Sequence, residues 1–228
     1  MSIFEDLPVM PLKSVLFPGS PTTLHIHEQR YREMLDECVE GDGVFGVALL
    51  RAGQEVGGPS IPHDVGTIAH IAEVTRLHDG SSVVLAQGGR RFRIDVILQA
   101  MPIIRADVRL LEESDDLAEA DQDLESMVRE RLGRLMRLVM RTMGADHPRP
   151  ELPDDPVALS YAVAANLQAP LKVQQELLEA RSVTDRLEMS LPMLGREVVH
   201  YRIMAAARAK LEQLGLVEED SELPFSRS

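Results

Sequence analysis

The sequence has no tryptophan, one cysteine (Cys38) and three lysines (Lys13, Lys172 and Lys210) among its 228 residues. A single cysteine excludes an intrachain disulfide. Aromatic residues make up only 4% of the chain, so aliphatic side chains and eleven methionines must fill the interior. No apolar run approaches the roughly 18 residues of a membrane span, and no amino-terminal signal pattern is present. We therefore expect a cytoplasmic globular protein with no membrane partner.

Positive charge is also scarce. The net charge is −13, and the deficit runs through both halves. Residues 1–115 carry 10 Lys and Arg against 17 Asp and Glu, and residues 116–228 carry 14 against 20. Neither half has the basic excess with which proteins neutralise a phosphate backbone. This balance disfavours nucleic acid as a partner.

Local signatures of catalysis are missing too. A P-loop needs Gly-x-x-x-x-Gly-Lys-Ser/Thr, and none of the three lysines follows a glycine. No Gly-x-Ser-x-Gly elbow occurs. We expect no enzyme and no cofactor, and the alternative is a hydrolase whose site is assembled without a local signature.

Short apolar runs separated by Gly, Pro and Asp-Gly turns fill residues 7–112 and are typical of strands. Asp79-Gly80 indicates a hairpin, because glycine tolerates the positive φ of a tight turn. Seven short strands in this length predict a small barrel or two packed sheets. The expected strands are residues 9–12, 22–27, 45–50, 66–77, 83–87, 92–100 and 104–111.

One helix interrupts the strands, at residues 29–40. Its apolar residues recur at helical spacing and form one buried stripe of Tyr31, Met34, Leu35, Cys38 and Val39. Cys38 lies in the stripe and is expected to be an inert core thiol. Residues 52–64 are rich in Gly and Pro and are expected to form an exposed loop.

The second half has a helical pattern. We expect helices at residues 117–143, 156–167 and 171–180, and one or two more in residues 182–214, with Pro192 a kink or break. Asp155 before Pro156 predicts a helix cap. These patterns divide the chain into a strand-rich subdomain (1–115), a helical bundle (116–216) and an acidic flexible tail (217–228).

Residues 7–32, which include Phe17-Pro18-Gly19, resemble the opening of the Lon substrate-recognition (LON N-terminal) domain. Further similarity lies in residues 45–47 and 65–71, in Gly88-Gly89-Arg90-Arg91-Phe92, and in residues 173–187. The resemblance covers about 200 residues and implies an α+β fold, in which a PUA-like pseudo β-barrel with one inserted helix precedes an α-helical bundle.

The same resemblance implies a polypeptide-binding role, linked to protein quality control. The Ser–Lys pair of Lon proteolysis and the ATPase are missing, so we expect a stand-alone, non-catalytic recognition module. Its oligomeric state is left open. Val15, Leu16 and Phe17, in a turn between strands, are candidates for binding a partner, and the alternative is that all three belong to the core.

Arg90, Arg91 and Arg93 form a basic cluster, in which strand alternation puts Arg91 and Arg93 on one face and Phe92 on the other. Because a PUA-like barrel is also a nucleic-acid scaffold, Arg91 and Arg93 are candidate partner-binding residues, and nucleic-acid binding is the alternative function.

Two further groups permit a functional and a structural interpretation. His25 and His27 share a strand face and could chelate a metal, but no third ligand is evident, so no metal site is expected. Arg134, Arg137 and Arg141 lie on one arc of a helix. They form either a patch for acidic partners or RNA, or a solvated face paired with nearby carboxylates.

Overall fold

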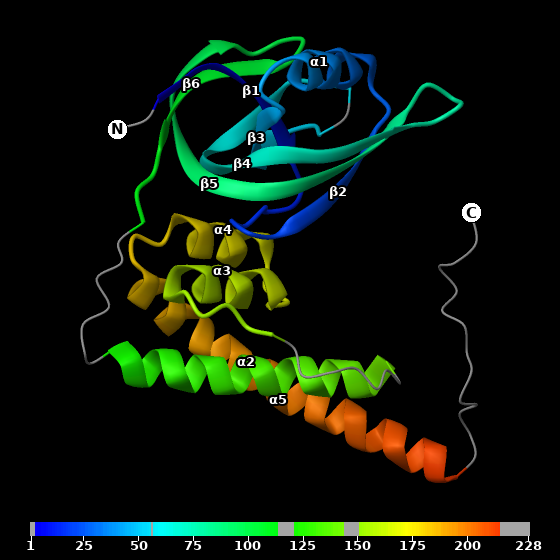
Figure 1. Cartoon of the computed structure of the whole chain (residues 1–228), viewed down its shortest axis with the longest axis vertical. Coiled ribbons are helices and arrows are strands. Elements are labelled where there is room, and N and C mark those ends of the chain that lie inside the picture. Colours follow the sequence, from blue (N-terminus) through cyan, green and yellow to red (C-terminus); the bar gives the residue numbers. More distant parts are fainter. Residues whose placement is uncertain (1–2, 56, 114–120, 144–150, 215–228) are drawn as a thin grey trace.

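The computed structural model describes residues 3–55, 57–113, 121–143 and 151–214. A strand-built body and a group of helices occupy opposite ends of the molecule (Figure 1). The described strands are β1 (Ile3–Leu12), β2 (Pro21–Ile26), β3 (Val44–Gly53), β4 (Ser60–Arg76), β5 (Ser82–Gln99) and β6 (Ile104–Leu110). The described helices are α1 (Gln29–Glu40), α2 (Asp121–Met143), α3 (Pro156–Asn166), α4 (Leu171–Glu179) and α5 (Val183–Gln213).

The described strands form one mixed sheet in the order β2-β5-β4-β3-β1-β6. β1 and β3 are parallel, and the other pairs are antiparallel. β4 pairs along one edge of β5, while β2 and then β6 pair along the other edge. Because β6 also pairs with β1, the sheet closes on itself into a pseudo-barrel. The α+β, PUA-like fold class expected from the resemblance is confirmed.

Helix α1 has the predicted bounds and covers one end of the barrel. Tyr31, Met34, Leu35 and Cys38 are buried against the barrel strands, as their spacing predicts. Burial raises the pKa of the Cys38 thiol to about 11, in agreement with an inert core cysteine. The inclusion of Val39 in the stripe was wrong, because its side chain is half exposed.

Strand β5 corrects the predicted number of strands, because residues 83–87 and 92–100 belong to one continuous strand. Gly88 and Gly89 mark close approaches, not a turn. A Cβ on Gly88 would lie 2.2 Å from the carbonyl oxygen of Phe17, and one on Gly89 would lie 2.4 Å from Nε2 of His70. The predicted loop at 52–64 was also too long, since β3 continues to Gly53 and β4 begins at Ser60.

The helical end is built around a core of α2, α3, α4 and α5 side chains. Val128, Leu132 and Leu135 lie at helical spacing on one face of α2 and are buried, whereas Met143 is exposed. Asp155 caps α3 by accepting a hydrogen bond from the Ala158 amide, as predicted. α5 is one helix that continues through Pro192. The predicted flexible tail at 217–228 lies outside the described residues, as does the predicted boundary at 115–116.

Candidate functional site

The segment between β1 and β2 joins the barrel to the helices. Leu16 is buried in a cluster of barrel and α1 side chains, and Phe17 is buried in the helical core. Val15 is partly buried and packs against that same helical core. The structure thus places these three predicted binding residues at the junction of the two halves, with Leu16 and Phe17 only 7% and 3% exposed. Leu16 and Phe17 are therefore not open to a partner in this conformation, whereas Val15 keeps part of its surface exposed.

A tight turn follows this segment. The amide of Ser20 donates to the carbonyl of Phe17 at 3.1 Å, and Gly19 has a φ of 75°, which favours glycine. Gly19 and Ser20 also hydrogen-bond to the backbone of Gly88 on β5, which extends the β2–β5 ladder. Phe17 is therefore a buried anchor, and Pro18 and Gly19 form the tight turn that follows it.

Arg91 crosses from the barrel to the helices. Its side chain is 2% exposed and binds Glu113 through two bonds, from Nε at 2.8 Å and from Nη2 at 3.0 Å. Nη1 donates to the carbonyls of Leu178 and Ala180 at 2.6 and 2.8 Å. These carbonyls lie at the end of α4, so Arg91 satisfies backbone acceptors that a helix end leaves unpaired.

Arg186 of α5 reaches the same place from the helical side and is fully buried. It donates to Oγ of Ser160 at 2.6 Å, to the Tyr161 hydroxyl at 2.9 Å and to the Leu177 carbonyl at 3.2 Å. The Tyr161 hydroxyl in turn donates to Oε1 of Glu113 at 2.6 Å. Burial lowers the pKa of Arg186 and raises the pKa of Tyr161.

These residues, Arg91, Glu113, Tyr161 and Arg186, form what we call the junction network. Two buried guanidinium groups face one carboxylate, and both oxygens of Glu113 accept hydrogen bonds. The hydroxyl proton of Tyr161 is donated to Glu113. The groups of the network therefore hold the barrel and the helices together, and their polar atoms are occupied by one another.

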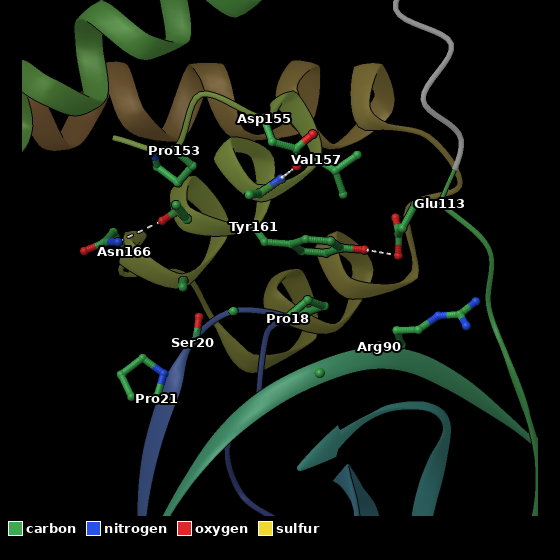
Figure 2. A pocket seen from close by; sticks show the side chains of 15 residues that line it. Pro18, Ser20, Pro21, Arg90, Glu113, Pro153, Asp155, Val157, Tyr161 and Asn166 are labelled. Atoms are coloured by element: carbon green, nitrogen blue, oxygen red, sulfur yellow. Dashed lines mark hydrogen bonds between the residues drawn. The ribbon is translucent and has the colours of Figure 1, made fainter. Parts of the chain in front are cut away.

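A cleft of about 490 Å³ opens beside this network, between the turn before β2 and helix α3. Figure 2 shows Tyr161 and Glu113 in one wall, with Pro18 and Pro21 below and Pro153 and Val157 above. The lining is mainly apolar. Its polar members include Ser20, Arg90, Asp155 and Asn166. This volume lies in the range of about 300–1,000 Å³ that is typical of ligand sites.

Helix α3 explains why the cleft is apolar. One face buries Leu159 and Val163 in the helical core. The other face presents Ala158, Ala162 and Ala165 to the cleft at helical spacing. A helix that is apolar on all sides normally belongs in an interior. α3 instead leaves one apolar face accessible, and small side chains there keep the cleft open.

The remaining predicted residues are dispersed. Arg93 is exposed on β5, and Arg90 lines the mouth of the cleft, so the predicted basic cluster does not form one patch with buried Arg91. His25 is exposed on β2, and His27 is exposed just after the end of that strand. Among the described residues, no group of three or more His, Cys, Asp and Glu is arranged to hold a metal ion. No helix in the described part is long and apolar enough to cross a bilayer.

Sequence reasoning did not identify Glu113, Tyr161 and Arg186. A signal was present for Arg186, because it falls among Val183, Leu187, Ser190 and Leu194 on the buried face of α5. An arginine in an apolar stripe must find buried acceptors. Nothing comparable distinguished Glu113, which follows β6 beside other acidic residues.

Comparison with known proteins agrees with this architecture. The sequence model of the ATP-dependent protease La (LON) substrate-binding domain matches residues 6–196. Lon protease 2 of Herpetosiphon aurantiacus is 32% identical over 198 residues, and Lon protease 2 of Myxococcus xanthus is 27% identical over 196. Each match covers 85% of this chain and 24% of the relative, so the chain spans about a quarter of the length of these proteins.

A solved structure provides independent support. The crystal structure of a Lon N-terminal domain protein from Xanthomonas campestris aligns with a TM-score of 0.63 at 26% identity, covering 83% of this chain and 98% of that one. The matched region includes the barrel, the junction network and the cleft. The chain therefore belongs to the family of ATP-dependent protease La (LON) substrate-binding domains.

Proposed function

We propose that this chain binds apolar polypeptide segments in the cleft between the turn before β2 and helix α3. The observation that carries the proposal is the apolar face of α3, which is exposed to a cleft of about 490 Å³ beside the junction network. Membership of a substrate-binding domain family supports the same conclusion.

The lining favours short apolar side chains in an extended peptide. Pro18, Pro21 and Pro153 present rigid apolar surfaces, and the alanines of α3 leave room between them. Rigid walls reduce the conformational entropy that binding would otherwise cost. Ser20 and Asn166 supply polar atoms at the edge, where a peptide backbone can form hydrogen bonds.

Recognition without cleavage is the second part of the proposal. The sequence lacks a P-loop and lacks lysines in the context of the Lon protease pair. In the cleft wall, Glu113 and Tyr161 are hydrogen-bonded to each other and to arginines, so neither is free to activate a nucleophile. A role in protein quality control follows if the bound segments are those that unfolded chains expose.

Nucleic acid, the alternative partner from the sequence, gains no support from the arrangement of the arginines. Arg91 is enclosed by helix α4 and Glu113, and Arg93 is the exposed member of the candidate pair. Binding to a phosphate backbone usually needs several accessible basic groups together.

Two matched substitutions, each of which replaces an exposed alanine by arginine, test the binding site. Ala165 is exposed and lines the cleft, so Ala165→Arg fills it without disturbing the core. We expect affinity for fluorescein-labelled reduced casein, measured by fluorescence anisotropy, to fall about tenfold, which corresponds to about 1.4 kcal/mol. Ala72→Arg makes the same change at an exposed position of β4, outside the cleft, and should leave affinity unchanged.

Equal affinities for both variants and the wild type would place binding elsewhere. Incubation of the chain with casein, with and without ATP, checks the second part. Intact casein on a denaturing gel is expected, and reproducible fragments absent from a casein-only control would overturn the non-catalytic role.

A further inference from the structure

Positive charge is concentrated at the end of the molecule farthest from the barrel. Residues 131–143 of α2 contain four arginines and no acidic residue. Residues 198–213 of α5, which pack beside α2, contain three basic residues and one acidic residue. We call these two stretches the basic arm. The arm carries +6 in a chain whose net charge is −13 (Figure 1 shows α2 and α5 in the layer opposite the barrel).

A groove of about 400 Å³ lies between the two helices of the arm. Three arginines and one glutamate line it, Arg141, Arg202, Arg208 and Glu212, together with Leu138 and three alanines of α5. Arg208 is fixed by Glu212 at 2.7 Å and by the Thr142 carbonyl at 2.7 Å. Within the described part of the chain, neither Arg141 nor Arg202 forms an ion pair, and both are exposed.

This arrangement answers a question that the sequence left open. The two alternatives for these arginines were a patch for acidic partners or RNA and a solvated face paired with nearby carboxylates. Among the described residues, the ion pairs of α2 and the end of α5 join Arg129 to Glu125 and Arg208 to Glu212, and none involves Arg134, Arg137 or Arg141. Four like charges on one short helix segment repel each other, so a bound anion would lower their free energy.

We propose that the groove of the basic arm binds an acidic peptide segment, and that its occupant is residues 218–222 of this chain, Glu-Glu-Asp-Ser-Glu. This segment carries four negative charges, which complement the arginines of the groove. It follows Leu214, which lies just beyond the end of α5, so a short tether connects it to the arm.

The tether has the required length. Residues 218–222 begin four residues after Leu214, and an extended chain spans about 3.3 Å per residue, so they reach about 13–26 Å from it. Arg202 lies twelve residues before Leu214 on a helix that rises about 1.5 Å per residue, which is about 18 Å. A short tether also gives a local concentration on the order of millimolar, which favours this occupant over a free acidic peptide.

If the chain's own acidic segment occupies the groove, it should compete with an added peptide of the same sequence, and this competition can be measured. The probe is a fluorescein-labelled peptide with the sequence of residues 215–228, titrated with full-length chain and followed by fluorescence anisotropy. One full-length variant has its acidic segment neutralised by Glu218→Gln, Glu219→Gln, Asp220→Asn and Glu222→Gln. We expect this variant to bind the probe at least about fivefold more tightly than the wild type, whose own segment occupies the groove.

Two charge-matched variants of the neutralised chain locate the binding. Arg141→Glu with Arg202→Glu should weaken probe binding about tenfold or more. Arg51→Glu with Arg181→Glu, at exposed positions outside the arm, makes the same change in net charge and should have less than about a twofold effect. Raising the salt from about 0.05 M to about 0.3 M should also weaken binding, because exposed charges are screened.

Three results would overturn the proposal: no binding of the probe at low salt, equal affinity of the wild-type and neutralised chains, or equal weakening by the two double substitutions. Circular dichroism of each variant verifies that the helices are retained. Because the cleft beside α3 is not involved, failure here would leave the proposed polypeptide-binding function unaffected.

Discussion

Arg186 stacks on the ring of Tyr161, with Cζ 3.8 Å from the ring centroid, and donates a hydrogen bond to the same residue's hydroxyl at 2.9 Å. Both side chains are buried. Because the Tyr161 hydroxyl then donates to Glu113, which Arg91 of the barrel also binds, one phenol group connects α5 to the barrel. The relationship makes Tyr161 the first residue at which to test the junction.

Tyr161→Phe should destabilise the chain by about 1–2 kcal/mol. The change keeps the stacking with Arg186 and removes the hydroxyl, leaving a buried donor of Arg186 without that acceptor. The free energy of unfolding, from urea titration followed by circular dichroism, measures the loss. Tyr201→Phe deletes the same atom from an exposed hydrogen bond with Gln168, and should cost less than about 0.5 kcal/mol. Equal losses would contradict the importance of the junction network.

Glu113→Gln should have a larger effect, about 2–3 kcal/mol. It removes the negative charge shared by Arg91 and Arg186, which are 2% and 0% exposed, so two buried guanidinium groups lose their counterion. The value lies below that of a fully buried pair, since a quarter of the Glu113 side chain is exposed. Urea unfolding at neutral pH gives the measurement.

Glu212→Gln is the matched control for the loss of one ion pair. Glu212 binds Arg208 on the surface of α5 at 2.7 Å, and this pair should contribute no more than about 0.5 kcal/mol. If both glutamate variants lost the same stability, the buried arginines would not depend on Glu113.

Local sequence patterns predicted the bounds of α1 well. The helical spacing of its apolar residues and the glycine at its end are both local signals. They failed at β5. Gly88 and Gly89 look like a turn in the sequence, but their meaning depends on Phe17 and His70, which approach them only in the folded barrel.

The candidate site was predicted in outline only. The sequence directed attention to Phe17 and Arg91, and the structure places both at the junction beside the cleft. Their partners Tyr161 and Arg186 are 70 or more residues away from Arg91 along the chain. No local pattern reports which distant hydroxyl or carboxylate a buried arginine will meet, so the network required the fold.

Gly88→Ala should destabilise the chain by about 2 kcal/mol or more. A Cβ there would lie 2.2 Å from the backbone oxygen of Phe17, and backbone cannot move aside as a flexible side chain can. Thermal or urea unfolding measures the loss. A helix glycine provides the opposite control: Gly195→Ala meets only the mobile end of Arg131 at 3.4 Å and should stabilise α5 by about 0.5–1 kcal/mol. Destabilisation by both, to the same extent, would contradict the close approach at Gly88.

Cys38 should make stability depend on alkaline pH. Burial, with a smaller contribution from the charge of Glu37, raises the pKa of its thiol from 9.0 to about 11. Above pH 9 the unfolded chain loses this proton while the folded chain keeps it, so the contribution of Cys38 to stability falls as pH rises towards 11. The slope is at most about 1.4 kcal/mol per pH unit.

Cys38→Ala removes this titrating thiol, so the difference in unfolding free energy between the wild type and the variant reports the contribution of Cys38 at each pH. At about pH 8 the wild type should be more stable by about 1 kcal/mol, because alanine leaves a small gap under α1. Between about pH 8 and pH 10.5 this difference should shrink by about 1–2 kcal/mol. Urea unfolding of both proteins in reductant gives the two curves. Tyrosines and lysines titrate in both chains and cancel in the difference, so parallel curves across this range would show that the Cys38 thiol is not held in its neutral form by burial.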